Sequence, residues 1–196
     1  MKFQLFALLL LAVFYGCYFG KMAGQRRRGI RTDQLGRGKT GLARRVELST
    51  KAAAVLVPAA EAASVLLGRS ALPFPARAAG LALTAAGTAV FVCSVLTMKD
   101  SWRAGVSPDE RTHLVTGGVY RYSRNPAFLG FDLVYLGILL MFWNPPLALL
   151  SGTAAALFHL QIVMVEEPHL SAAFGEEYLA YRRRVRRYLG RRRSPQ

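Results

Sequence analysis

Five long apolar runs constrain this chain more than any other feature of its sequence. They cover residues 3–20, 52–67, 79–98, 128–143 and 147–165. Each is long enough for a helix that crosses about 30 Å of hydrocarbon. Because a chain of 196 residues has no core that could bury five such segments, we predict an all-α integral membrane protein with five transmembrane helices.

The second run is the least regular of the five. It is rich in Ala and carries Pro58 and Glu61 near its middle. A carboxyl group is costly in hydrocarbon, so Glu61 is expected to face the other helices. The first run is followed by no small-residue cleavage site, and we expect it to remain as an anchor.

The basic residues predict the orientation. The formal charge is +15, and about nine Lys/Arg lie in residues 21–45, about five in 99–124 and about eight in 182–193. Residues 68–78 and the turn 144–146 hold few or none. By the positive-inside rule, the N-terminus lies outside and the C-terminus in the cytoplasm.

A basic chain can also bind nucleic acid, but these basic runs adjoin membrane ends and carry no nucleic-acid motif. Cys17 and Cys93 lie inside predicted spans, and the three His residues are scattered. We therefore expect membrane lipid and no nucleic acid as a partner, and no metal site. The oligomeric state is left open.

Two regions follow from this organisation. Residues 1–98 form a three-helix membrane region, whose Gly- and Arg-rich stretch 26–45 is expected to be a flexible cytoplasmic loop that sets the topology. Residues 99–196 form a cofactor-binding region with the last two membrane helices and a C-terminal helix. Its loop 99–125 holds Trp, Tyr and charged residues, which favours an ordered, functional segment.

The C-terminal helix is predicted from apolar residues that recur at spacings of three and four. They are Leu170, Phe174, Tyr178, Tyr181, Val185 and Tyr188, with Arg on the other face and a break near Gly175. Such a helix lies in the membrane interface. It serves as an anchor, as a lid over a site, or as both.

A site is predicted where the fourth span begins. Asn125-Pro126 indicates a helix N-cap followed by the first helical residue, and Arg124 adds positive charge to that end. The fifth span ends at Glu166-Glu167. Because the two spans form an antiparallel hairpin, these groups must be neighbours.

The result is one cytoplasmic pocket with an anion-binding side and a cation-binding side, walled by Trp102, Tyr120 and Phe128. A ligand with a carboxylate, an ammonium group and an aromatic ring suits it, and S-adenosylmethionine has all three. The alternative is that the two Glu residues only neutralise Arg124.

The segments "SWRAGV", "LVTGGVYRYSRNPAF", "VEEPHL" and "FGEEYLAYRRRV" resemble the isoprenylcysteine carboxyl methyltransferase family, which is related to membrane phospholipid N-methyltransferases. The likeness covers roughly residues 98–189. It implies a membrane methyltransferase that takes S-adenosylmethionine from the cytoplasm and a lipophilic acceptor from the bilayer. Together with Arg124, the cofactor-binding residues would be His113, Leu114, Val115, Tyr120, Asn125, Pro126, Phe128 and Glu166.

Two departures from the family pattern matter. Asn125 stands where the family usually has His, so an acid/base role for that residue does not carry over, and Phe128 replaces a usual Tyr. Ile162 stands where the prenylcysteine enzymes have an Arg that orients the acceptor carboxylate. This favours a lipid, prenyl or phenolic acceptor with a neutral or weakly acidic head over a prenylcysteine acid.

The candidate catalytic residues are His159 and Glu167. His159 precedes Glu166 by seven residues and should share its helix face, so it could accept a proton from the acceptor. Asp132 is a further candidate. Interhelical hydrogen bonds are the alternative role for these groups.

The alternative functions are a prenylcysteine carboxyl methyltransferase proper, a small membrane channel, carrier or scaffold, and a lipid-binding relative that has lost catalysis. A carrier should gather its polar groups near the midplane, whereas here they gather at one face.

Overall fold

The computed structural model describes residues 2–106 and 113–191, and its long elements are all helices. They are α1 (Lys2–Arg27), α2 (Gly41–Leu67), α3 (Phe74–Met98), α4 (Pro126–Met141), α5 (Pro145–Gln161) and α6 (Glu167–Arg184). Short 3-10 turns form at η1 (Lys99–Ser101) and η2 (Gly118–Arg121), and a π-helical turn, η3 (Ile162–Glu166), joins α5 to α6. Part of the expected loop 99–125 and the end of the basic C-terminal run lie outside the described residues.

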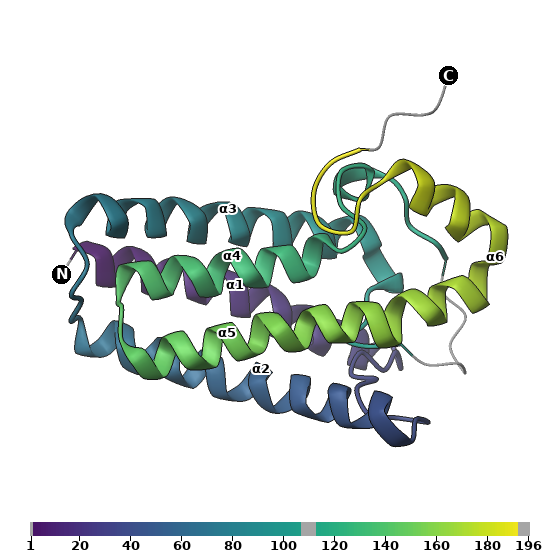
Figure 1. Cartoon of the computed structure of the whole chain (residues 1–196), viewed down its shortest axis with the longest axis horizontal. Coiled ribbons are helices and arrows are strands. Elements are labelled where there is room, and N and C mark those ends of the chain that lie inside the picture. Colours follow the sequence, from purple (N-terminus) through teal and green to yellow (C-terminus); the bar gives the residue numbers. More distant parts are fainter. Residues whose placement is uncertain (1, 107–112, 192–196) are drawn as a thin grey trace.

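Helices α1 to α5 lie side by side in one elongated bundle, and α6 bends over one end of it (Figure 1). Four helical stretches are long and apolar enough to cross a membrane: Lys2–Arg27, Gly41–Leu67, Phe74–Ser101 and Pro145–Arg184. Helix α4 is apolar but shorter, with 16 residues. The predicted all-helical membrane class is confirmed.

Glu61 lies in the interior of the bundle, as its charge requires. Its side chain is fully buried, and its Oε2 accepts a hydrogen bond of 2.6 Å from the hydroxyl of Tyr15 on α1. Helix α2 continues through Pro58. The irregular second run is therefore one continuous helix whose only central carboxyl group is turned away from lipid.

Glycines bring α3 and α4 into backbone contact. A Cβ on Gly87 of α3 would lie 2.7 Å from the carbonyl oxygen of Gly130 on α4. A Cβ on Gly137 would lie 2.6 Å from the carbonyl oxygen of Gly80. Small residues allow membrane helices to approach this closely. The contact fixes where α4 begins relative to α3, and the candidate site lies at that point.

An aromatic layer crosses the bundle below the end that α6 covers. Phe14 and Phe91 are fully buried, with ring centroids 4.5 Å apart, and Phe131 packs on Phe91 at 5.1 Å. Tyr18 meets Trp102 edge to face at 5.5 Å. These rings give the site a rigid apolar floor.

The segment between α1 and α2, residues 28–40, is ordered rather than flexible. Its backbone pairs with residue 104: Gln34 N donates to Ala104 O at 2.8 Å, and Ala104 N donates to Thr32 O at 2.9 Å. Buried Gln25 accepts from the Thr32 hydroxyl at 2.6 Å and donates to Trp102 O at 3.0 Å. The expected loop over residues 26–45 is shorter than predicted, since α1 ends at Arg27 and α2 begins at Gly41, and it has hydrogen-bond partners far away in the sequence that were not expected. We call residues 28–40 the α1–α2 segment.

Candidate functional site

A cavity lies at the end of the bundle where α4 begins and α5 ends. Eight of the residues predicted for the cofactor site line it: His113, Leu114, Val115, Tyr120, Arg124, Asn125, Phe128 and Glu166. Pro126, Glu167 and His159 are not among the lining residues. The structure thus brings together side chains from the loop before η2, the start of α4 and the end of η3.

The walls of the cavity are largely aromatic. Trp102 and Tyr120 are both buried and line it, while Phe128 packs on Phe158 with ring centroids 5.3 Å apart. The hydroxyl of Tyr120 shares a 2.8 Å hydrogen bond with Ser94. Burial raises the pKa of Tyr120, so this hydroxyl stays protonated and neutral. The wall therefore offers flat apolar surface with no added charge.

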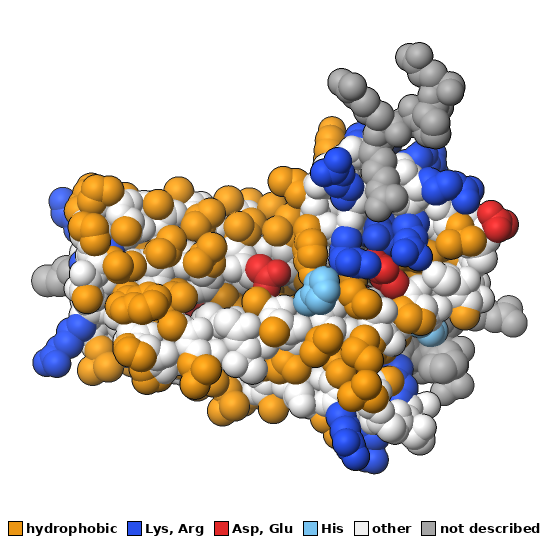
Figure 2. Space-filling view, in the orientation of Figure 1, with side chains coloured by type: hydrophobic (Ala, Val, Ile, Leu, Met, Phe, Trp, Pro, Cys, Tyr) orange, Lys and Arg blue, Asp and Glu red, His pale blue; other side chains and the backbone are white. Residues whose placement is uncertain are grey.

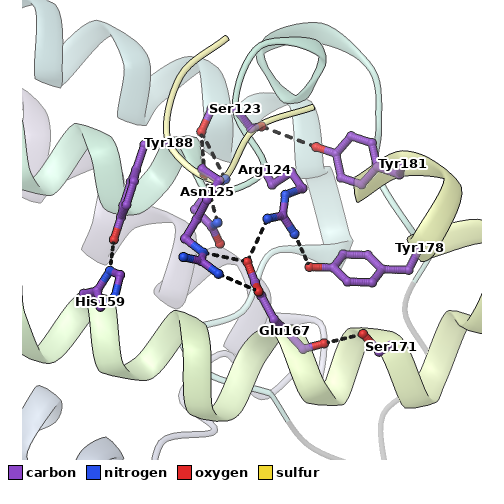
Figure 3. A network of polar contacts seen from close by, with 10 residues as sticks. Ser123, Arg124, Asn125, His159, Glu167, Ser171, Tyr178, Tyr181 and Tyr188 are labelled. Atoms are coloured by element: carbon purple, nitrogen blue, oxygen red, sulfur yellow. Dashed lines mark hydrogen bonds and ion pairs between the residues drawn. The ribbon is translucent and has the colours of Figure 1, made fainter. Parts of the chain in front are cut away.

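The two neighbouring carboxylates have different positions. Glu167 lies 2.9 Å from Arg124 and accepts two hydrogen bonds from Arg187, at 2.8 and 3.0 Å (Figure 3). Glu166 instead lines the cavity. The expected proximity of the α4 start and the Glu pair is confirmed. The alternative prediction, that the Glu residues only neutralise Arg124, thus fits Glu167. It does not fit Glu166, whose carboxyl group belongs to a residue of the cavity lining.

Arg124 is held firmly in place. It is 8% exposed, and its NH1 donates to the Tyr178 hydroxyl at 2.8 Å. Its Nε is buried and has no partner among the described residues. The hydrogen bond to Glu167 raises the pKa of Arg187, which keeps that second cation charged. The charge of Arg124 is thus paired with Glu167, while one buried N–H of its guanidinium group has no partner among the described residues.

Asn125 occupies the N-cap position of α4 and Pro126 the first helical position, as expected. The Asn125 side chain does not cap the helix, however. Its Nδ2 donates to Arg187 O at 3.0 Å, and the Ser123 hydroxyl accepts from Asn125 N at 3.1 Å. Asn125 therefore ties the returning C-terminal segment, residues 185–190, to the start of α4 (Figure 3).

His159 lies outside the cavity. Its ring is exposed, and its Nδ1 forms a 2.6 Å hydrogen bond with the Tyr188 hydroxyl (Figure 3). In a regular α-helix seven residues return to nearly the same face, but the wider π-helical turn η3 lies between His159 and Glu166. The expectation of a shared face is wrong for this reason. Asp132 is half-buried, and it too is not among the lining residues.

Helix α6 covers the cavity. It is broken at Gly175, whose φ of 49° and ψ of −127° are non-helical, as the sequence predicted. Leu170, Phe174, Tyr178 and Tyr181 of its apolar face line the cavity, and the Tyr181 hydroxyl donates to Tyr120 O at 2.7 Å. Tyr188, which was predicted to share this face, lies beyond the helix because α6 ends at Arg184.

Periodicity did not identify several polar groups of the cavity. Thr50 of α2 and Gln161 of α5 line it, and Thr50 Oγ1 and Gln161 Oε1 are buried without a partner among the described residues. His169 lines it as well. With Arg124 Nε, three residues of the cavity wall carry a buried polar atom that has no partner among the described residues. Such atoms are uncommon in proteins, and their grouping around one cavity is typical of a site for a polar ligand.

Comparison with known proteins places the chain in a family. Residues 75–177 match the family described as phospholipid methyltransferase. The chain is 31% identical over 104 residues to protein-S-isoprenylcysteine O-methyltransferase A of Arabidopsis thaliana, covering 52% of this chain and 53% of that protein. It is 36% identical over 72 residues to the Schizosaccharomyces pombe protein-S-isoprenylcysteine O-methyltransferase, covering 37% of this chain and 30% of that protein.

A phosphatidylethanolamine N-methyltransferase of Phaeosphaeria nodorum is 36% identical over 70 residues, 35% of this chain and 7% of that protein. The chain spans about half or less of the length of these curated relatives. The resemblance to the isoprenylcysteine enzymes is confirmed, and the family match runs from the first turn of α3 into α6. Because this match covers more than half of the chain, the protein belongs to the phospholipid methyltransferase family.

Proposed function

We propose that this protein is an integral-membrane methyltransferase that uses S-adenosylmethionine to methylate a lipophilic acceptor. The cavity is the observation that carries the proposal. Its lining holds the carboxyl group of Glu166 and three residues that carry a buried polar atom without a partner among the described residues, Thr50, Arg124 and Gln161, and it lies at the end of an apolar bundle. A carrier or scaffold has no need for such a set of groups at one end.

The polar groups of the cavity suit the cofactor. Glu166 can accept hydrogen bonds from its ammonium group or ribose hydroxyls. Gln161 and Arg124, two further lining residues, carry an acceptor and a donor that have no partner among the described residues. Phe128 and Trp102 offer flat surfaces to its adenine ring. When bound, S-adenosylmethionine supplies a methyl group that its positive sulfur already activates.

The chain's own task is then to align the acceptor and exclude water. Tyr178 and Tyr181 of α6 and Leu35 of the α1–α2 segment close the cavity from two sides. Where the acceptor carries a proton, His113 and His169 line the cavity and are available to receive it. His159 has no part in this proposal.

We propose that α4 crosses the membrane as a fifth span. It runs beside α3 along the bundle, and the N-terminus lies at the opposite end from α6 (Figure 1). Most of the Lys and Arg side chains on this face gather around the end that α6 covers, while hydrophobic side chains predominate along the bundle and a few Lys/Arg lie at its opposite end (Figure 2). The proposed orientation has the N-terminus outside, with α6 and the cavity at the cytoplasmic interface.

The acceptor we propose has a long apolar tail and a neutral or weakly acidic head. Ile162 is fully buried and supplies no cation to the cavity. The charge of Arg124 is already paired with Glu167. Phe131, Phe158 and Ala54 instead extend the cavity with apolar surface between the helices, which suits a lipid, prenyl or phenolic chain.

The test is a transfer assay with methyl-labelled cofactor and purified protein in lipid vesicles. Phosphatidylethanolamine, long-chain phenols and prenylcysteine acids are offered in parallel, and Glu166→Gln serves as the variant with a weakened site. We expect labelled phenol or amine lipid with the parent and far less with the variant. Preference for prenylcysteine acids would show that another cation replaces the missing Arg; no labelled product from any lipophile would contradict the proposal.

A further inference from the structure

Glu47 joins three separate parts of the chain. It lies in the second turn of α2 and is fully buried. Its Oε2 accepts a 2.7 Å hydrogen bond from Gly36 N, and its Oε1 pairs with Lys39 Nζ. The same Oε1 accepts a 3.2 Å hydrogen bond from Gln161 Nε2. Since Gly36 and Lys39 belong to the α1–α2 segment and Gln161 ends α5, Glu47 links that segment to the cavity wall.

Gln161 connects Glu47 to the wall of the cavity. A carboxylate beside Lys39 only accepts hydrogen bonds, so Gln161 must turn its NH2 group toward Glu47. Gln161 itself lines the cavity. The hydrogen bond between Glu47 and Gln161 therefore fixes which way the Gln161 amide lies and leaves its Oε1 as an acceptor without a partner among the described residues.

The α1–α2 segment itself closes on the cavity. Leu35 lines it, and Lys39 Nζ also donates to the backbone oxygen of Val106, another lining residue, at 2.7 Å. Gly105 adopts a φ of +82°, and a Cβ there would lie 3.2 Å from Leu35 N. The segment and Glu47 both precede the residues that match the family.

We propose that Glu47 is a positioning residue for the cofactor site, and that through it closure of the α1–α2 segment and orientation of the Gln161 side chain in the cavity wall occur together. This inference rests on the proposed function and takes S-adenosylmethionine or its demethylated product as the ligand. Opening the segment withdraws Lys39 and Gly36 from Glu47 and loosens the hold on Gln161. Because such coupling is reciprocal, a ligand that contacts Gln161 favours the closed segment.

The test follows trypsin cleavage of the full-length protein in detergent, with and without S-adenosylhomocysteine. Arg31 and Arg37 are exposed in the α1–α2 segment, and mass spectrometry identifies cuts at these positions. In the parent we expect the ligand to slow both cuts. In Glu47→Gln we expect most of this protection to vanish and the dissociation constant to rise about tenfold, as the loss of one charge-assisted contact implies.

The matched control is Lys51→Gln. Lys51 pairs with Asp33, so it also joins α2 to the α1–α2 segment, but the pair is exposed and has no contact with Gln161. We expect this variant to keep ligand protection and to bind within about twofold of the parent. If Lys51→Gln loses as much protection from trypsin as Glu47→Gln does, then any contact between α2 and the α1–α2 segment has the same effect. That result would overturn a specific role for Glu47.

If Glu47→Gln does not fold, Lys39→Met tests the same ion pair by removing its cation. Lys39 lies outside the helices, and we expect the same loss of protection and affinity. If either folded variant binds S-adenosylhomocysteine as the parent does, with protection intact, the inference is wrong while the proposed function stands. If the parent itself binds none, the proposed function fails.

Discussion

Arg124 at the start of α4 and Glu167 at the start of α6 form an ion pair of 2.9 Å in which both residues are less than one tenth exposed. The pair joins two elements 43 positions apart along the chain (167 − 124), and Tyr178 and Arg187 complete it. Because Arg124 also lines the cavity, this buried ion pair holds together the elements that form the cavity wall.

We expect Arg124→Met to lower the free energy of unfolding by roughly 3 kcal/mol, because it leaves Glu167 with one cation and Tyr178 without its donor. Thermal unfolding in detergent measures the change. Arg183→Met is the control, since Arg183 and Glu176 form an exposed contact of 3.9 Å, and no measurable change is expected. Equal melting temperatures for the two variants would argue against a structural role for the pair.

Gly87→Ala tests the backbone contact between α3 and α4. The added Cβ would lie 2.7 Å from the carbonyl oxygen of Gly130, so the helices must separate. We expect a loss of roughly 1–3 kcal/mol, as for other overpacked sites. Gly152→Ala in α5 meets nothing within 4 Å and should leave the melting temperature unchanged or slightly higher. A Gly87→Ala protein as stable as Gly152→Ala would mean that the two helices can slide apart freely.

Gly175→Ala separates backbone strain from packing. A Cβ at this position meets nothing within 4 Å, but the φ of 49° with ψ of −127° is strained for any residue except Gly. We expect a loss of about 1–3 kcal/mol, together with weaker binding of S-adenosylhomocysteine, because the kink turns Tyr178 over the cavity. Calorimetry that shows unchanged affinity would rule out α6 as the lid.

The His159–Tyr188 contact is expected to anchor the C-terminal segment and to take no part in proton transfer. His159→Phe and Tyr188→Phe should each leave the pH dependence of methyl transfer unchanged. Their effects on stability should not add, since both remove the same 2.6 Å hydrogen bond. A shift in the pH profile with His159→Phe alone would restore the imidazole to the reaction.

The sequence predicted those parts of the site that depend on regular geometry. An antiparallel hairpin necessarily places Arg124 beside the end of the fifth span, and spacings of three and four residues identified Tyr178 and Tyr181 as one face of α6. The break at Gly175 was equally visible. Each of these follows from local pattern plus one tight turn.

The errors arose where the structure departs from regular helix or depends on distant partners. The π-helical turn between Gln161 and Glu167 changes which residues share a face, and no periodicity rule reveals it. The order of the α1–α2 segment depends on Gln25 and Glu47, two buried polar side chains whose partners lie far away in the sequence. A Gly- and Arg-rich stretch is typical of a solvated loop, and local sequence patterns do not reveal hydrogen bonds to partners so far away in the chain.

Binding of S-adenosylmethionine in the cavity that Glu166 lines is tested most directly by a calorimetric titration of the detergent-solubilised protein with S-adenosylhomocysteine. We expect one binding site per chain in the parent. In Glu166→Gln, which keeps the shape of the side chain and removes its charge, we expect binding about tenfold weaker or more at an unchanged melting temperature. A folded parent that shows no binding heat at millimolar ligand, or a Glu166→Gln variant that binds as tightly as the parent, would contradict the account.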